Sequence, residues 1–500
     1  MKRVRPGAAL IVLAALLLLL PAAAFGQRLA EAVREHALAN GMKLLIVERK
    51  ASPTVAAWIR FKVGSVDERS DERGIAHLLE HMLFKGTQTL GTADYEAERP
   101  LLEKIEATAQ RLLAEKARRH RGDPALIPRL ETELADLEKA AGAFVVKNEF
   151  AEIYARHGGT GYNAFTSRDG TAYMINLPAN KLELWAAIES DRMRNPVLRE
   201  FYSERSVVME ERRRTVETQP RGLLWESFLA TAFWVHPYGQ PIIGWMSDIE
   251  RLSRTKAESF LKRYYAPKNA VVAVVGDIDP AQVTALVERY FGDINPGISV
   301  PPVAVEEPPQ QGERRTALSL EAEPQLLMGF HKPVFPDPAA AVYDVLTMLL
   351  ADGYTSRLHR RLVLEKQIAT SVTAFGTPGD RYPNLFVVAA TPRSPHGTDE
   401  VEAAIMEELE RLQKEPVTER ELEQIRNRMA FEEVSQMASN GGLARLLTHY
   451  ETVTGSWRDL DEQRRLIAAV TPADLMVAAK RAFTTGNRTV ATIQRKEKRP

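Results

Sequence analysis

The segment "NPGISVPPVAVEEPPQQGERR", residues 295–315, constrains the fold of this chain more than any other stretch. Proline lacks a backbone N–H and has a fixed φ, so the five prolines of this segment are incompatible with a continuous helix or a central strand. A chain of 500 residues is also too long for one hydrophobic core. We therefore expect an interdomain linker at 295–315, between an N-terminal domain over 27–294 and a C-terminal domain over 316–500.

The two halves resemble each other near their ends. "AESFLKRYYAPKNAVVAVVG" (257–276) aligns without gaps with "LMVAAKRAFTTGNRTVATIQ" (475–494), and Asn269 then matches Asn487. Each segment predicts a helix, a turn and a strand. Five identical positions alone are compatible with coincidence, but the equivalent place in each half favours a duplicated α+β domain.

The N-terminus has the residue order of a secretory signal peptide. Lys2, Arg3 and Arg5 precede the apolar run "AALIVLAALLLLL", which is followed by Pro21 and the small residues of "AAAFGQ". A membrane anchor is the alternative, but the run is short for a bilayer span. We expect cleavage after a signal peptide at residues 1–26, export, and no stable membrane anchor afterwards. The net charge of zero gives no indication of nucleic-acid binding, and without cysteine the exported protein has no disulfides.

The stretch "GIAHLLEHMLFKG", residues 74–86, contains a candidate metal site. On a helix, His77 and His81 project from one face a turn apart, with Glu80 beside them. Two imidazoles at this spacing can ligate one Zn²⁺, and the carboxylate can accept a proton from the attacking water. The order His-x-x-Glu-His is the inverse of the commoner zinc-protease motif. A purely structural pair of histidines is the alternative.

A third ligand is expected because catalytic zinc takes three protein ligands and leaves one position open. In "EFYSERSVVMEERRR", Glu204 and Glu211 share one helical face two turns apart, whereas Glu210 points elsewhere. An acidic helix face is most often only solvated, so this segment alone does not decide the ligand.

Two further segments predict hairpins. Residues 97–145, with "GDPA" at a turn, are strongly helical and charged, which predicts a helical hairpin with a solvated face. "NAFTS", a turn at 168–170 and "TAYMINL" predict a β-hairpin. "HPYG" at His236 is expected to be a structural turn rather than a further ligand.

Four segments together carry a family resemblance: "HLLEH", "ERSVVMEE", "GGTGYNAFTSRDGTAYMINLP" and "HPYGQPIIG". They resemble the M16 metallopeptidases, the pitrilysin and mitochondrial processing peptidase family, in its short two-domain form. The resemblance implies one Zn²⁺ per chain, held by His77, His81 and Glu211, with Glu80 as general base and Glu204 orienting the site. The distance in sequence from His81 to Glu211 is longer than the family's usual one, and the 97–145 hairpin explains the excess as an insertion.

The resemblance also implies the fold. Each domain should be an antiparallel-rich β-sheet covered by α-helices, and the two domains should form half of a clamshell chamber. By the same resemblance, the backbone of a peptide substrate should add to an edge strand formed by Asn163, Ala164, Phe165 and Thr166. An ordinary core hairpin is the alternative for this segment.

The second half departs from the family pattern. Family members that complete a site usually carry an Arg and a Tyr, seven residues apart, after an "SRL" segment. In "YTSRLHRRLVLEKQIATSVTAF" these positions are occupied by Val363 and Thr370. We therefore expect a heterodimer in which a related chain supplies the Arg/Tyr substrate clamp, in preference to a homodimer. The alternative is a family member that needs no such pair.

The sequence thus predicts an exported, periplasmic zinc endopeptidase that acts on extended peptides or unfolded segments. A noncatalytic binding or assembly subunit is the competing hypothesis, because the family also includes members that only bind or scaffold. The intact His77, Glu80, His81 and Glu211 favour the peptidase.

Overall fold

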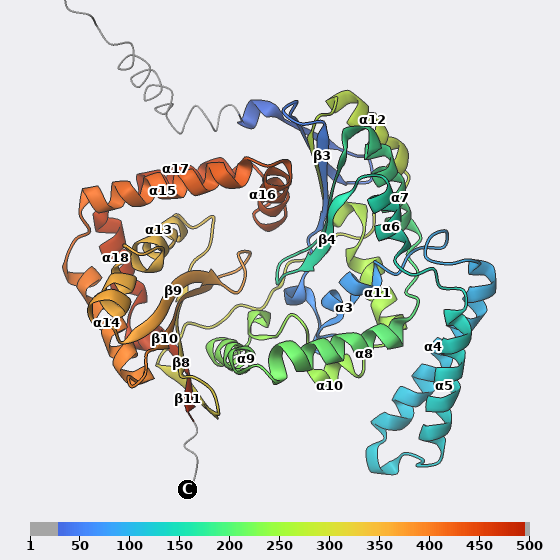
Figure 1. Cartoon of the computed structure of the whole chain (residues 1–500), viewed down its shortest axis with the longest axis horizontal. Coiled ribbons are helices and arrows are strands. Elements are labelled where there is room, and N and C mark those ends of the chain that lie inside the picture. Colours follow the sequence, from blue (N-terminus) through green and yellow to red (C-terminus); the bar gives the residue numbers. More distant parts are fainter. Residues whose placement is uncertain (1–28, 496–500) are drawn as a thin grey trace, which may run out of the picture.

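A computed structural model describes residues 29–495 (Figure 1), so the predicted signal peptide lies outside the described residues. Two sheets form the framework. The N-terminal sheet has the order β1-β2-β6-β3-β5-β4, and the C-terminal sheet has the order β7-β11-β8-β10-β9. The strands are β1 (Val33–Ala37), β2 (Lys43–Glu48), β3 (Thr54–Phe61), β4 (Thr160–Thr166), β5 (Thr171–Pro178), β6 (Ala270–Gly276), β7 (Arg314–Leu320), β8 (Gln325–Lys332), β9 (Ala369–Thr377), β10 (Asn384–Pro392) and β11 (Arg488–Arg495).

Helices cover both sheets (Figure 1). Those of the first half are α3 (Ile75–Met82), α4 (Tyr95–Ala117), α5 (Leu126–Gly142), α6 (Glu149–Arg156), α7 (Leu182–Arg194), α8 (Phe201–Arg212), α9 (Pro220–Ala232), α10 (Met246–Ile249), α11 (Arg254–Tyr264) and α12 (Pro280–Phe291). Those of the second half are α13 (Ala339–Ala351), α14 (Thr398–Lys414), α15 (Glu419–Met437), α16 (Asn440–Val453), α17 (Asp459–Ala469) and α18 (Pro472–Ala482).

The two sheets are built in the same way, which confirms the predicted α+β fold with two related domains. β6 lies parallel to β2 and antiparallel to β3, and β11 has the same relation to β7 and β8. The aligned asparagines also have equivalent roles. Asn269 donates to the carbonyl of Tyr264 at 2.9 Å, and Asn487 donates to that of Ala482 at 3.0 Å, each bonding back to the end of the preceding helix.

The proline-rich segment joins the halves without regular structure. Residues 295–313 contain neither helix nor strand, and β7 begins at Arg314, just before the predicted end of the linker. The segment is nevertheless attached to the first half. The carboxylate of Glu307 accepts the backbone N–H groups of Trp234, Val235 and His236 at 2.8–3.1 Å.

Each half places a helix on the sheet of the other half. α9, from the first half, packs Leu224, Phe228 and Leu229 against the C-terminal sheet, in a cluster that includes Leu385 and Ala491. In return, α16 from the second half packs against the N-terminal sheet, where an apolar cluster contains side chains from both halves of the chain. The members from α16 are Leu443, Ala444, Leu446 and Leu447, and those from the central strands include Leu45, Trp58, Val271, Ala273 and Val275.

The helical hairpin α4–α5 projects away from the two sheets (Figure 1), at the place of the predicted insertion. Its two helices bury a shared apolar stripe, with Ile105 and Leu112 on α4 and Leu130 and Leu134 on α5. Among the described residues, 29–495, no helix has the length and apolar character needed to cross a membrane.

The exchanged helices predict a large effect of Phe228 on stability. Phe228 is fully buried, and its ring lies over Gly329 of the C-terminal sheet. We expect Phe228→Ala to lower the free energy of unfolding by about 3–5 kcal/mol, because it opens a cavity between the two halves. Urea denaturation measures this. Phe431→Ala, at a side chain that is 71% exposed, is the matched control and should change stability by less than about 0.5 kcal/mol. Equal effects of the two variants would contradict the packing described.

Candidate metal centre and substrate strand

The helix that carries the histidines is fixed at its N-terminus and along one face. The carboxylate of Glu68 accepts the backbone N–H groups of Gly74 and Ala76, each at 2.9 Å, so two free donors at the start of α3 are satisfied. Gly74 has φ of 89° and lies against Gly244, where a Cβ would come within 2.7 Å of the Gly74 Cα. Leu78, which follows His77, is buried in the core.

His77, His81 and Glu211 converge, with one possible ligand atom from each lying within 4.8 Å of the others. The Nε2 atoms of His77 and His81 lie 3.8 Å and 3.6 Å from the Glu211 carboxylate oxygens. Burial lowers the pKa of His77 to about 4, with the charge of His81 contributing, so His77 is neutral at pH 7. Two imidazoles and a carboxylate are a donor set that fits Zn²⁺ with one position left open.

Glu204, which lies seven residues before Glu211, orients His81. Its Oε1 lies 2.9 Å from His81 Nδ1, and its Oε2 lies 2.7 Å from Lys85 Nζ. The hydrogen bond from His81 lowers the pKa of Glu204 to about 2, with a further contribution from Lys85. For His81, burial alone would lower the pKa, but the bond to Glu204 and the nearby carboxylates raise it. The bond engages Nδ1 and leaves Nε2 on the side of Glu211.

Glu80 lies beside the ligands and is held by the predicted substrate strand. The hydroxyl of Thr166 donates to Glu80 Oε2 at 2.6 Å. Burial raises the pKa of Glu80, and the hydrogen bond from Thr166 partly offsets this. The structure therefore gives Thr166 a contact with the proposed general base that the sequence analysis did not predict.

The predicted substrate strand lies at the edge of its sheet. Among residues 29–495, β4 pairs with β5 alone, and residues Asn163, Ala164, Phe165 and Thr166 form its regular part. Ala164 is buried on the α3 side of the sheet, whereas Phe165 packs on the other side against Trp58, with ring centroids 6.3 Å apart. Successive side chains thus alternate between the faces, and the free backbone edge remains available for pairing.

A cleft of about 1020 Å³ begins at the candidate metal centre. His77, Glu211 and Thr166 line one end of it. Its other walls include residues of α9 and of the C-terminal sheet, among them Trp225 and Phe375, whose ring centroids lie 6.0 Å apart. The candidate site therefore opens into a space that both halves of the chain enclose.

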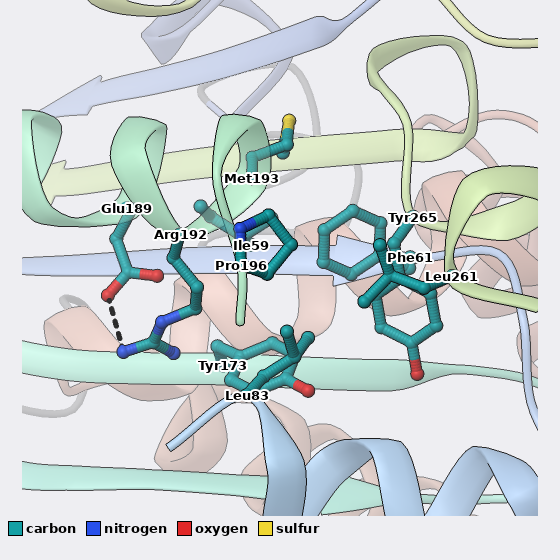
Figure 2. Close-up of a pocket in the computed structure, with 10 residues that line it drawn as sticks. All are labelled: Ile59, Phe61, Leu83, Tyr173, Glu189, Arg192, Met193, Pro196, Leu261 and Tyr265. Atoms are coloured by element: carbon teal, nitrogen blue, oxygen red, sulfur yellow. Dashed lines mark ion pairs between the residues drawn. The ribbon is translucent and has the colours of Figure 1, made fainter. Parts of the chain in front are cut away.

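A buried arginine supports the predicted substrate strand from behind. Figure 2 shows the ion pair between Arg192 and Glu189, at 3.4 Å, beside Tyr173. The Arg192 guanidinium also lies over the rings of Phe84 and Tyr162, at 5.7 Å and 5.6 Å. Phe84 follows α3 and Tyr162 belongs to β4, so one buried cation connects the helix of the histidines to β4.

The two positions expected for the substrate clamp carry neither an arginine nor a tyrosine. Val363 lies in a short π-helix (His359–Glu365) and packs against the core of the C-terminal domain. Thr370, at the start of β9, is exposed, and its hydroxyl donates to the carbonyl of Thr391 at 3.2 Å. His236 is buried, and its Nδ1 accepts the N–H of Tyr238 at 3.2 Å, in line with a structural role for the "HPYG" turn.

Comparison with known proteins identifies two family models along the chain. The model described as "Insulinase (Peptidase family M16)" matches residues 43–117 and 144–245, and the gap between the two stretches lies within the helical hairpin. The model described as "Peptidase M16 inactive domain" matches residues 251–429.

Individual relatives agree with these matches. The chain is 27% identical over 455 residues to the zinc protease PqqE of Helicobacter pylori, covering 89% of each sequence. The crystal structure of a protease from Helicobacter pylori has a TM-score of 0.77 and 25% identity, covering 92% of this chain and 99% of that one. The periplasmic protease PqqL of Escherichia coli has a TM-score of 0.69 and 18% identity, covering 94% of this chain but 49% of that one.

The Arg192 contacts predict a strong effect on stability. Arg192→Met leaves the Glu189 carboxylate buried without its cation, and we expect the free energy of unfolding to fall by about 3–5 kcal/mol. Urea denaturation checks this. Arg289→Met removes a comparable but exposed partner of Glu183 and should cost less than about 1 kcal/mol. A small effect at Arg192 would argue against its supporting role.

Proposed function

Because the chain belongs to the M16 peptidase family, we propose that it is a zinc-dependent endopeptidase that hydrolyses extended peptides or unfolded segments. One observation carries the proposal. The three candidate ligands, His77, His81 and Glu211, converge at the end of a cleft. Glu80 lies beside them and is hydrogen-bonded to Thr166 of an edge strand. The name zinc protease among the relatives supports the choice of metal.

His77, His81 and Glu211 would hold one Zn²⁺ per chain, and Glu204 would keep the His81 ring in place. When bound, zinc supplies a Lewis acid that polarises the scissile carbonyl and makes water acidic enough to lose a proton near pH 7. Glu80 accepts the proton of the attacking water and passes it to the leaving amine. Thr166 holds the Glu80 carboxylate on the side of the substrate strand.

The peptide would bind by pairing its backbone with the free edge of β4, at residues 163–166. Main-chain pairing fixes the direction of the peptide and makes few demands on its sequence. It suits extended or unfolded segments, because a folded substrate has its own backbone groups already paired. The cleft between the two halves has room for the side chains that flank the scissile bond.

A related second chain would complete the site. Val363 and Thr370 cannot provide the guanidinium and the phenol of the family's clamp, so we infer a heterodimer in which the partner supplies them. The length match supports a paired arrangement, because this chain corresponds to about half of the Escherichia coli protease PqqL. That neighbour is named a periplasmic protease, which supports the proposal that this chain is exported to the periplasm.

Glu80→Gln tests the function directly. We expect purified wild-type protein to contain one zinc per chain by elemental analysis, and the variant to keep the metal. With a related partner chain present, peptide cleavage should fall at least about 100-fold in the variant, because Gln cannot accept a proton. Glu210→Gln, next to Glu211 but 70% exposed, is the matched control and should cleave normally. Metal-free wild-type protein would favour a noncatalytic binding or assembly subunit instead. Full activity of the complex containing Glu80→Gln would do the same, because the cleavage would then come from the partner chain.

The missing clamp predicts dependence on a partner. The chain alone should cleave an unfolded peptide weakly or not at all, and addition of a related chain that carries the Arg/Tyr pair should restore activity. Size-exclusion chromatography should then show a complex containing both chains. Full peptidase activity of this chain without a second protein would show that the clamp is not needed.

A further inference from the structure

The turn that joins β4 to β5 is buried, although hairpin turns usually lie at the surface. Arg168 and Asp169, in the middle of this turn, are each only 4% exposed. Arg168 donates to the carbonyl of Gln240, beyond the "HPYG" turn. Further cover comes from the C-terminal domain, through a loop of residues 379–382 between β9 and β10, which we call the 379–382 loop.

One carboxylate joins the turn to this loop. Asp169 Oδ2 accepts the backbone N–H of Asp380 at 2.6 Å and that of Arg381 at 3.3 Å. Asp169 Oδ1 accepts the hydroxyl of Tyr238 at 2.6 Å, and the Tyr238 oxygen in turn accepts the N–H of Arg381 at 3.2 Å. The 379–382 loop packs tightly against these side chains, because a Cβ on Gly379 would lie 2.5 Å from both Asp169 Oδ2 and the Tyr238 hydroxyl.

The same turn is continuous with the candidate site. Ser167 closes it by donating both its N–H and its hydroxyl to the carbonyl of Gly170, each at 2.9 Å. Thr166, the last residue of β4, precedes this turn and donates to Glu80. A displacement of the 379–382 loop would therefore also move the short, hydrogen-bonded turn, and with it Thr166 at the end of the substrate strand and the carboxylate of Glu80 that Thr166 holds.

We propose that Asp169 is a positioning residue, through which the C-terminal domain sets the alignment of β4 and Thr166 relative to Glu80. The proposal rests on the proposed peptidase function. Asp169 is not among the candidate ligands or the residues of the strand edge, so it acts only through its neighbours. The second domain thereby takes part in the reaction even though it carries no clamp.

Two variants from opposite sides of the contact test the proposal. Asp169→Asn keeps the size but replaces one acceptor by a donor, so either the 379–382 loop or Tyr238 loses its partner. Gly379→Ala forces the loop away from Asp169 without touching the candidate site. Lys43→Met is the matched control. It removes another contact between the halves, the 2.6 Å ion pair with Glu451, on a strand at the far side of the sheet from β4.

Kinetics and hydrogen exchange provide the readouts, with each variant assayed beside the partner chain if the wild type requires one. We expect kcat per zinc-loaded, folded protein to fall about 10- to 100-fold in Asp169→Asn and Gly379→Ala, because misalignment near 1 Å is sufficient. Amides of residues 163–170 should exchange faster in both variants. The double variant should be no worse than the more affected single variant, since both break one contact. Lys43→Met should leave kcat and these amides unchanged.

A purely structural role gives a different result. If both variants lose activity only in proportion to folded protein, or if Lys43→Met has the same effect on kcat, the proposal is overturned. Failure of the peptidase function is recognised separately, by metal-free wild-type protein or an active Glu80→Gln. Even then, unchanged exchange at 163–170 in Asp169→Asn would show that Asp169 does not position β4.

Discussion

The two sheets of this chain each have two apolar faces, and each half needs the other to cover the second face of its own sheet. β6 illustrates the constraint, because all of its residues are buried and it therefore needs cover on both sides. The cover of the second face comes from the other half, through α16 on the N-terminal sheet and α9 on the C-terminal sheet. Separation of the halves would expose both faces, so their relative position is fixed by the hydrophobic effect.

The candidate site depends on this exchange of helices between the two halves. α9 follows shortly after α8, which carries Glu204 and the candidate ligand Glu211, so the helix that docks on the C-terminal sheet also anchors this segment. The cleft lies between that helix and the sheet, and it has a defined shape only because the two halves are held together. Arg192 and Asp169 then fix the substrate strand from two sides, the first from within its own domain and the second through the other domain.

Local patterns in the sequence predicted the elements that carry the candidate site but few of the contacts between elements. Periodicity placed His77, Glu80 and His81 on one helix, and the structure has them on α3. The aligned asparagines correctly indicated a duplicated domain. The approach of Glu211 to the histidines came from the family resemblance, because no rule of spacing predicts which distant helix faces α3. No local sequence pattern predicts the exchange of α9 and α16 between the halves or the contact of Thr166 with Glu80. Each depends on residues that are far apart in sequence.

The proposed substrate strand, β4, raises a physical question of its own, because an unpaired strand edge invites aggregation. The register of β4 shifts between Thr160 and Asn163, and Gly161 within this irregular part has φ of 64°. Such a bulge increases the local twist and interrupts the edge. Only residues 163–166 then remain regular enough to pair with another strand, and they end at Thr166, which is bonded to Glu80 at the end of the cleft. A short edge of this kind can hold one extended peptide across the candidate metal centre, yet it is too short to nucleate an extended sheet between copies of the protein.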